Sequence, residues 1–167
     1  ATKFIAASFV FMGLTACKNI DKYDVTFNDR PVYSPQRLFT DYRVSDKALA
    51  NCIEQAIEDF EIYTADGVEI LNCSDAGISS LLGLSQFANL RRLKLSDNEI
   101  RNLVELSVMT ELIEVQLDGN NVIDSVPLTS LPRVERINLA DNPALQCKGV
   151  AKFSLAIRIT LPEHCQS

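Results

Sequence analysis

The stretch LRRLKLSDNEI, residues 90–100, decides the fold. Its apolar spacing and its asparagine return 22 residues later, in Leu112, Val115, Leu117, Asn120 and Val122. The same period holds on both sides of this pair. It places Val68, Leu71, Cys73, Ala76 and Ile78 one step earlier, Val134, Ile137, Leu139 and Asn142 one step later, and Ala156, Ile159 and Leu161 a further step on. Because the period survives five frames without an insertion, the sequence predicts a solenoid.

The spacing within one frame predicts the shape of each coil. Leu93 and Leu95 are two residues apart, so they point to the same face of a short strand, and Asn98 then ends the strand in a turn. The amide of this asparagine can bond backbone groups of its own and adjacent coils. A second apolar series at three-residue spacing predicts 3₁₀ or short helical turns on the convex side. Its members are Leu81, Leu84 and Phe87; Leu103, Leu106 and Met109; Leu128 and Leu131; and Val150 and Phe153.

The pattern resembles the leucine-rich repeats, specifically the 22-residue kind of bacterial internalin-like proteins. The resemblance covers about residues 46–165 and departs from the family pattern at Cys73, at Ala76 and in the last frame, where terminal coils are expected to be atypical. It implies an α/β solenoid with a short parallel sheet of about five strands, an N-terminal cap helix and convex 3₁₀ or short helical turns. The expected strands centre on residues 70–73, 92–95, 114–117, 136–139 and 158–161.

The N-terminus has the pattern of a secretory signal peptide over residues 1–16. An apolar stretch from Phe4 to Leu14 follows Lys3 and is too short for a transmembrane helix. Leu14-Thr15-Ala16-Cys17 resembles the bacterial lipobox, which implies cleavage before Cys17 and acylation of that cysteine. An ordinary secreted protein with an incidental cysteine is the alternative. Lys18, where inner-membrane lipoproteins tend to carry Asp, implies delivery to the bacterial outer membrane, facing either the periplasm or the cell surface.

Four cysteines remain besides Cys17, an even number that indicates disulfides in an oxidising compartment. The repeat frame places Cys52 on the cap helix beside Cys73 on the first strand, and Cys147 near Cys165 at the far end. Pairing Cys52 with Cys73 and Cys147 with Cys165 keeps each bond at one end of the solenoid, whereas other pairings would have to span its length. A zinc site is the rival interpretation, but no CxxC is present and His164 is the only histidine.

The rest of the chain divides around the repeats. Residues 17–44 are expected to form a lipid-anchored tether, and its later apolar part is expected to lie against the cap. Residues 45–67 contain the cap helix, with Ser45 or Asp46 as its N-cap and an apolar face that ends at Phe60. Residues 68–142 are the repeats, and residues 143–167 form a C-terminal cap repeat.

The outward positions of the strands predict the candidate binding residues on the concave face, where such folds usually bind ligands. These residues are Arg92, Lys94, Glu114, Gln116, Arg136, Asn138 and Arg158. Glu114 is expected between two arginines, on the neighbouring strands about 4.8 Å away. Two interpretations stay open: a basic-leaning strip that recognises an acidic partner, or a self-paired ladder of solvated ions whose pairs contribute less than about 1 kcal/mol each.

Composition and motif content favour binding over catalysis. The net charge of −6 argues against a nucleic-acid surface, and the single histidine leaves little for nucleophilic catalysis. Asp75, Asp97 and Asp141 share one turn register, which turn geometry explains better than a metal site. We therefore expect no enzyme activity, cofactor or metal, and a function in binding another protein at the bacterial envelope. The alternative is an accessory subunit of an outer-membrane complex, docked through its tether or its convex side.

Overall fold

The computed structural model describes residues 25–33 and 36–166. Two compact units divide the chain at Arg37. In the first unit, strands β1 (Val25–Phe27) and β2 (Arg30–Tyr33) form an antiparallel hairpin around Asn28 and Asp29, both of which have positive φ. The hairpin was not predicted from the sequence. Cys17, the predicted lipidation site, lies outside the described residues.

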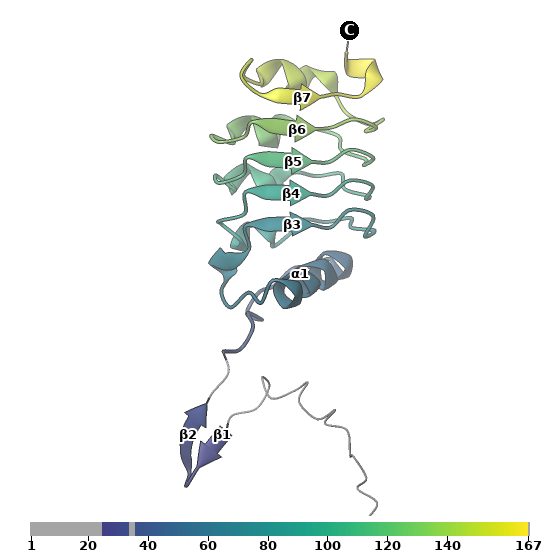
Figure 1. Cartoon of the computed structure of the whole chain (residues 1–167). Helices are drawn as coiled ribbons and strands as arrows, with labels where there is room; N and C mark the ends of the chain where they lie inside the picture. Colours follow the sequence, from purple (N-terminus) through teal and green to yellow (C-terminus); the bar gives the residue numbers. More distant parts are fainter. Residues whose placement is uncertain (1–24, 34–35, 167) are drawn as a thin grey trace, which may run out of the picture. The chain divides into compact units, whose positions relative to one another are not determined.

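The second unit is a solenoid built on a five-stranded parallel sheet (Figure 1). The strands are β3 (Ile70–Asn72), β4 (Arg92–Lys94), β5 (Glu114–Gln116), β6 (Arg136–Asn138) and β7 (Arg158–Thr160). Each pairs with the next at an offset of one repeat, as in Ile70 with Arg92. The predicted solenoid, its strand positions and its parallel order are confirmed.

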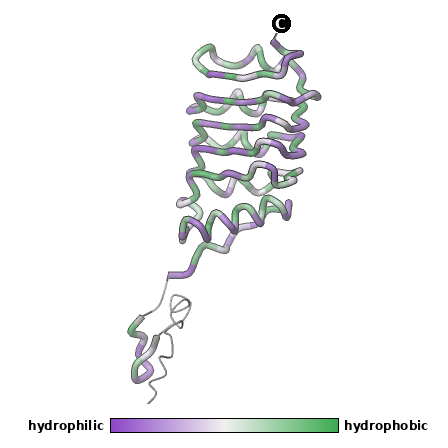
Figure 2. Tube along the Cα trace, turned by 45° about the vertical axis from the view of Figure 1, so that its right-hand side comes forward, coloured by the Kyte–Doolittle hydropathy of each residue, from purple (hydrophilic) through white to green (hydrophobic). Residues whose placement is uncertain are grey.

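Short 3₁₀ helices return the chain on the convex side of each coil, as the apolar spacing predicted. They are η3 (Leu84–Gln86), η4 (Val104–Val108), η5 (Val126–Ser130) and η6 (Cys147–Lys152), with η2 (Ala65–Gly67) before the sheet and η7 (Glu163–Cys165) after it. The inward residue of each strand is buried against these turns, from Leu71 to Ile137. Hydrophobic and hydrophilic stretches therefore alternate along each coil (Figure 2).

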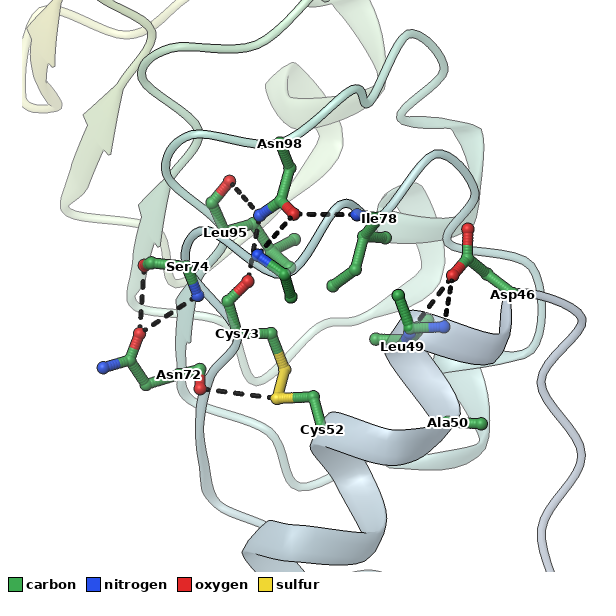
Figure 3. The surroundings of a disulfide bond; sticks show 12 residues. Asp46, Leu49, Ala50, Cys52, Asn72, Cys73, Ser74, Ile78, Leu95 and Asn98 are labelled. Atoms are coloured by element: carbon green, nitrogen blue, oxygen red, sulfur yellow. Dashed lines mark hydrogen bonds between the residues drawn. A yellow bond between two sulfur atoms is a disulfide. The ribbon is translucent and has the colours of Figure 1, made fainter.

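Buried asparagines join successive coils. Asn98 accepts hydrogen bonds at Oδ1 from the N–H of Ile78 (2.8 Å) and of Ala76 (3.2 Å), and its Nδ2 donates to the carbonyls of Cys73 and Leu95 (Figure 3). Asn120 and Asn142 repeat this arrangement one and two coils further on. Each amide thus satisfies backbone groups in two coils at once.

The residue before each asparagine position has a left-handed backbone. Asp75, Asp97 and Asp141 have φ between 51° and 56°, and Gly119 has φ 67° at the same register. Aspartate tolerates this conformation and glycine adopts it without strain. Turn geometry therefore accounts both for the row of aspartates and for its interruption at Gly119. A side chain at Gly119 would also meet Asp97, whose Oδ1 lies 2.3 Å from the position of an added Cβ.

Helix α1 (Lys47–Asp59) covers the first coil. Asp46, one of the two predicted N-caps, accepts at Oδ1 from the N–H groups of Ala48 and Leu49, while Oδ2 accepts from Ser79 and Ser80 in the first coil. Burial works to raise the pKa of Asp46, but these hydrogen bonds outweigh it and hold the pKa below its ordinary value. The sequence indicated the cap and not this bridge to the coil.

The predicted apolar face of the helix is wrong at one position. Phe60 follows the last helical residue as the C-cap and its side chain is 69% exposed. The helix ends at Asp59, so Phe60 does not continue the helical turn that would place its side chain on the buried face. No helix in the described part of the chain is long and apolar enough to cross a membrane.

Both predicted disulfides are present, Cys52–Cys73 at the cap helix and Cys147–Cys165 at the other end. Residues 38–44 also contact the core, through Leu38, Phe39, Tyr42 and Val44.

The last coil differs from its prediction. Ala156, expected to point inward, is exposed, and Ile157 packs against the core instead. This coil lacks the turn asparagine and the described residues provide no further coil to cover it, so its inward register is relaxed.

Asn98, Asn120 and Asn142 together form an asparagine ladder that runs through the coils. Replacing one of these asparagines is expected to destabilise the whole solenoid. Asn120→Ala removes the acceptor of the Ile100 N–H and the donor to Leu95 and Leu117. Since buried backbone groups would lose their partners, we expect the free energy of unfolding to fall by about 3 kcal/mol in chemical denaturation. The matched control is the exposed neighbour in Asn121→Ala, with an expected change within about 0.5 kcal/mol. Equal losses in the two variants would contradict the ladder's role.

Candidate functional site: the concave face

The strands bring all seven predicted binding residues onto one face of the sheet. Arg92 and Lys94 lie on β4, Glu114 and Gln116 on β5, Arg136 and Asn138 on β6, and Arg158 on β7. Because the strands are in register, these residues form two rows. The first row runs Ile70, Arg92, Glu114, Arg136, Arg158, and the second runs Asn72, Lys94, Gln116, Asn138, Thr160.

Glu114 is paired with one arginine rather than shared by two. Its Oε2 accepts from Arg136 Nη2 at 2.8 Å, and its Oε1 accepts from Gln116 Nε2 at 2.8 Å. The predicted position of Glu114 between two arginines is confirmed by the sheet register, which places it between Arg92 and Arg136. Its carboxylate forms its ion pair with Arg136, while Gln116 on the same strand occupies the second carboxylate oxygen.

The pKa of Glu114 lies below its ordinary value of 4.5. The main cause is the hydrogen bond from Arg136, followed by that from Gln116, and burial opposes both. The Arg136–Glu114 pair is also partly exposed, so its contribution to stability is small. The carboxylate therefore holds Arg136 in place more than it stabilises the fold.

The remaining cations of the face lack such a partner. Among residues 25–33 and 36–166, no carboxylate lies within 4.0 Å of Arg92, Lys94 or Arg158. The two rows hold four cations and one carboxylate, which gives 4 − 1 = +3 in a protein whose net charge is −6. The self-paired interpretation thus describes one pair, and the two rows together carry a net positive charge.

Two shallow hollows lie on this surface. One of about 270 Å³ lies over β5 to β7 between Glu114, Arg136 and Arg158. Another of about 260 Å³ includes Ile70 and Arg92 together with Glu69, Arg91 and Ile113, which precede the strands. Sequence reasoning missed these last three because it considered only strand positions; their shared place in the 22-residue period was the available signal. Each hollow presents arginine beside apolar or amide groups.

The amide side chains extend the polar network toward the turns. Asn138 Nδ2 donates to Asp118 Oδ1 (2.9 Å), and Ser96 Oγ donates to the same oxygen (2.8 Å). Asn138 is thereby oriented by a carboxylate, whereas no carboxylate of the described residues lies within 4.0 Å of Lys94.

At the C-terminal end, His164 lies beside the second disulfide. Cys147, His164 and Cys165 have their ligand atoms within 4.8 Å of one another, but the two sulfur atoms are bonded to each other. His164 Nε2 lies 3.0 Å from the Leu145 carbonyl oxygen. His164 thus lies within the predicted C-terminal cap repeat, residues 143–167, next to its disulfide.

Comparison with known proteins identifies the fold. No protein-family model matches the sequence, and no curated protein matches it. Among solved structures, internalin C2 from Listeria monocytogenes is similar, with 22% identity and a TM-score of 0.57 over 70% of this chain and 55% of that one. The chain thus spans about half the length of internalin C2.

Two other Listeria monocytogenes proteins share weaker similarity. The functional domain of InlJ is 24% identical, with a TM-score of 0.44 over 70% of this chain and 27% of that one. Internalin InlF is 19% identical, with a TM-score of 0.42 over 59% and 37%. The chain has the internalin-like leucine-rich repeat fold, defined by the likeness to internalin C2 and by its five-stranded solenoid.

The Arg136–Glu114 pair predicts which arginine lowers the pKa of Glu114. Arg136→Gln should raise the pKa of Glu114 toward its ordinary value, measured by carboxyl ¹³C NMR across a pH titration. Because the native pKa is lowered, the stability from this pair is present at neutral pH and is lost as pH falls through the native pKa, below 4.5. Arg92→Gln is the matched control and should leave the pKa of Glu114 nearly unchanged. An equal rise in both variants would mean that the carboxylate is shared.

Proposed function

We propose that the protein is a lipid-anchored, protein-binding module of the bacterial cell envelope, and that its concave face recognises an acidic segment of another protein. The observation that carries the proposal is the excess of cations on the face, of which Arg92, Lys94 and Arg158 have no carboxylate partner among the described residues. Their positive field would attract a negative segment and orient it along the rows.

The sheet is well suited to such recognition. Parallel pairing and the asparagine ladder fix the backbone beneath each side chain, so association requires little ordering of the binding surface. Arg136 is held by Glu114 and is presented in one orientation. The described solenoid has five strands, which favours one modest protein partner over a large glycan.

A second candidate function has its own supporting observation. On the convex side, Leu82, Val104 and Val108 are 59%, 62% and 66% exposed, and Leu82 and Val104 are one repeat apart. An accessory subunit of an outer-membrane complex could bury this apolar surface when it docks. The two candidates place the partner on opposite sides of the solenoid.

Charge reversal distinguishes these candidates. The triple variant Arg92→Glu, Arg136→Glu and Arg158→Glu should lose the partner that crosslinked affinity capture from intact cells recovers with the wild type, because the face would change from basic to acidic. The matched control reverses three exposed cations away from the sheet, Arg101, Lys148 and Lys152. It should retain the partner. Capture of the same partner by the concave-face variant would contradict the proposal and favour the convex side.

The anchor is tested separately. Cys17→Ala should abolish incorporation of a labelled fatty acid and release the protein from the membrane fraction, because the sulfur that would carry the lipid is absent. Mass spectrometry of the wild-type N-terminus should find an acylated Cys17. An unmodified Cys17, or a signal peptide cleaved elsewhere, would instead support an ordinary secreted protein.

A further inference from the structure

A hollow of about 310 Å³ lies where residues 38–42 cross helix α1, away from the concave sheet. Its lining combines several kinds of side chain. The apolar part comes from Leu38, Phe39 and Ile57. Tyr42 adds an aromatic ring, Glu54 and Glu58 add carboxylates, and Thr40 is the remaining lining residue. This volume is at the lower end of the range for small-molecule sites.

The aromatic side of the hollow is held in place by the core. Phe87 is fully buried, and its ring centroid lies 6.4 Å from that of Phe39 and 5.7 Å from that of Tyr42. The Tyr42 hydroxyl donates to the Ala50 carbonyl at 3.4 Å. Both rings are thus positioned before any ligand arrives.

The two carboxylates are placed against ordinary helix preferences. Glu54 and Glu58 are four residues apart on the same face, where like charges destabilise a helix. Glu58 also lies in the last turn, which contains no basic residue, although the helix dipole favours cations there. Among the described residues, no Lys, Arg or His lies within 4.0 Å of either carboxylate. A bound cation would offset all of these unfavourable terms.

The negative charge of Glu54 also acts on Tyr42, which lines the hollow. The pKa of Tyr42 is raised, first by burial and then by the negative charge of Glu54. A cation in the hollow would therefore lie near both carboxylates and near the aromatic rings of Phe39 and Tyr42.

We infer that this hollow binds an organic ammonium ion, with its apolar body against Leu38, Phe39 and Ile57 and its charged group between Tyr42, Glu54 and Glu58. The chemistry is shared by a free alkylammonium ligand and by the lysine side chain of a partner protein. The site is independent of the concave face, so the proposed function and this inference can fail separately.

The test is an NMR titration of the intact ¹⁵N-labelled chain with n-hexylammonium. We expect saturable shifts of the amides of Phe39, Tyr42, Glu54 and Glu58. Its neutral isostere 1-hexanol should bind more weakly, because it lacks the charge. Nα-acetyl-lysine methylamide is the second probe: tighter binding of this amide would assign the site to a lysine side chain, and tighter binding of hexylammonium to a free amine.

Variants then locate the binding. The double variant Glu54→Gln and Glu58→Gln should weaken hexylammonium binding by about tenfold, as expected for the loss of two exposed charge pairs. Glu61→Gln is the matched control, since it removes the same charge just beyond the same helix end from a residue that does not line the hollow. Unchanged spectra away from the hollow would show that each variant folds.

Three results would overturn the inference. They are the absence of saturable shifts up to the solubility limit of both ammonium probes, equal affinity for 1-hexanol, or an equal loss of affinity in Glu61→Gln. The last result would show that the general negative field of the helix end attracts the cation and that the hollow does not.

Discussion

The structure depends on one constraint: a single coil can neither bury its own apolar face nor provide hydrogen-bond partners for all of its backbone polar groups. The neighbouring coil must provide both the burial and the partners. The asparagine ladder meets this requirement. Asn98, Asn120 and Asn142 each bond backbone groups of two coils, so every coil position is defined by the one before it. Since a buried polar group without a partner destabilises the fold, the ladder also excludes slipped stacking.

The first and last described coils use other devices, because among the described residues each has a neighbouring coil on one side only. Ala76 stands where the first asparagine would be, and helix α1 covers that coil instead, joined through Asp46 and through Cys52–Cys73. At the other end, Cys147–Cys165 closes the last turn onto the coil. Disulfides over sequence separations of 21 and 18 residues each stabilise by about 3 kcal/mol through the unfolded chain.

The repeat made most of the fold predictable from the sequence, and its limits fall where the repeat stops. The strands, the 3₁₀ turns and the cysteine pairs follow from the period. Phe60 and Ala156 were misplaced because the end of a helix and the last described coil are determined by tertiary contacts and not by periodicity. In the candidate site, the period placed the seven residues on the predicted face of the sheet. It did not predict that Glu114 pairs with Arg136 rather than with Arg92, because that pairing depends on the bond from Gln116 and on side-chain rotamers, which residue spacing does not encode.

The stacking that orders the coils also fixes the spacing of the charges in the two rows of the concave face, which together carry +3 on an acidic protein. The central claim is that this face is covered by a partner in the cell. Arginine footprinting with a dicarbonyl reagent tests it most directly, by comparing the protein in intact cells with the purified protein. The account predicts that Arg92 and Arg158 react more slowly in the cells, while the reactivity of Arg101 is unchanged. Equal reactivity of Arg92 and Arg158 in the two preparations would contradict it.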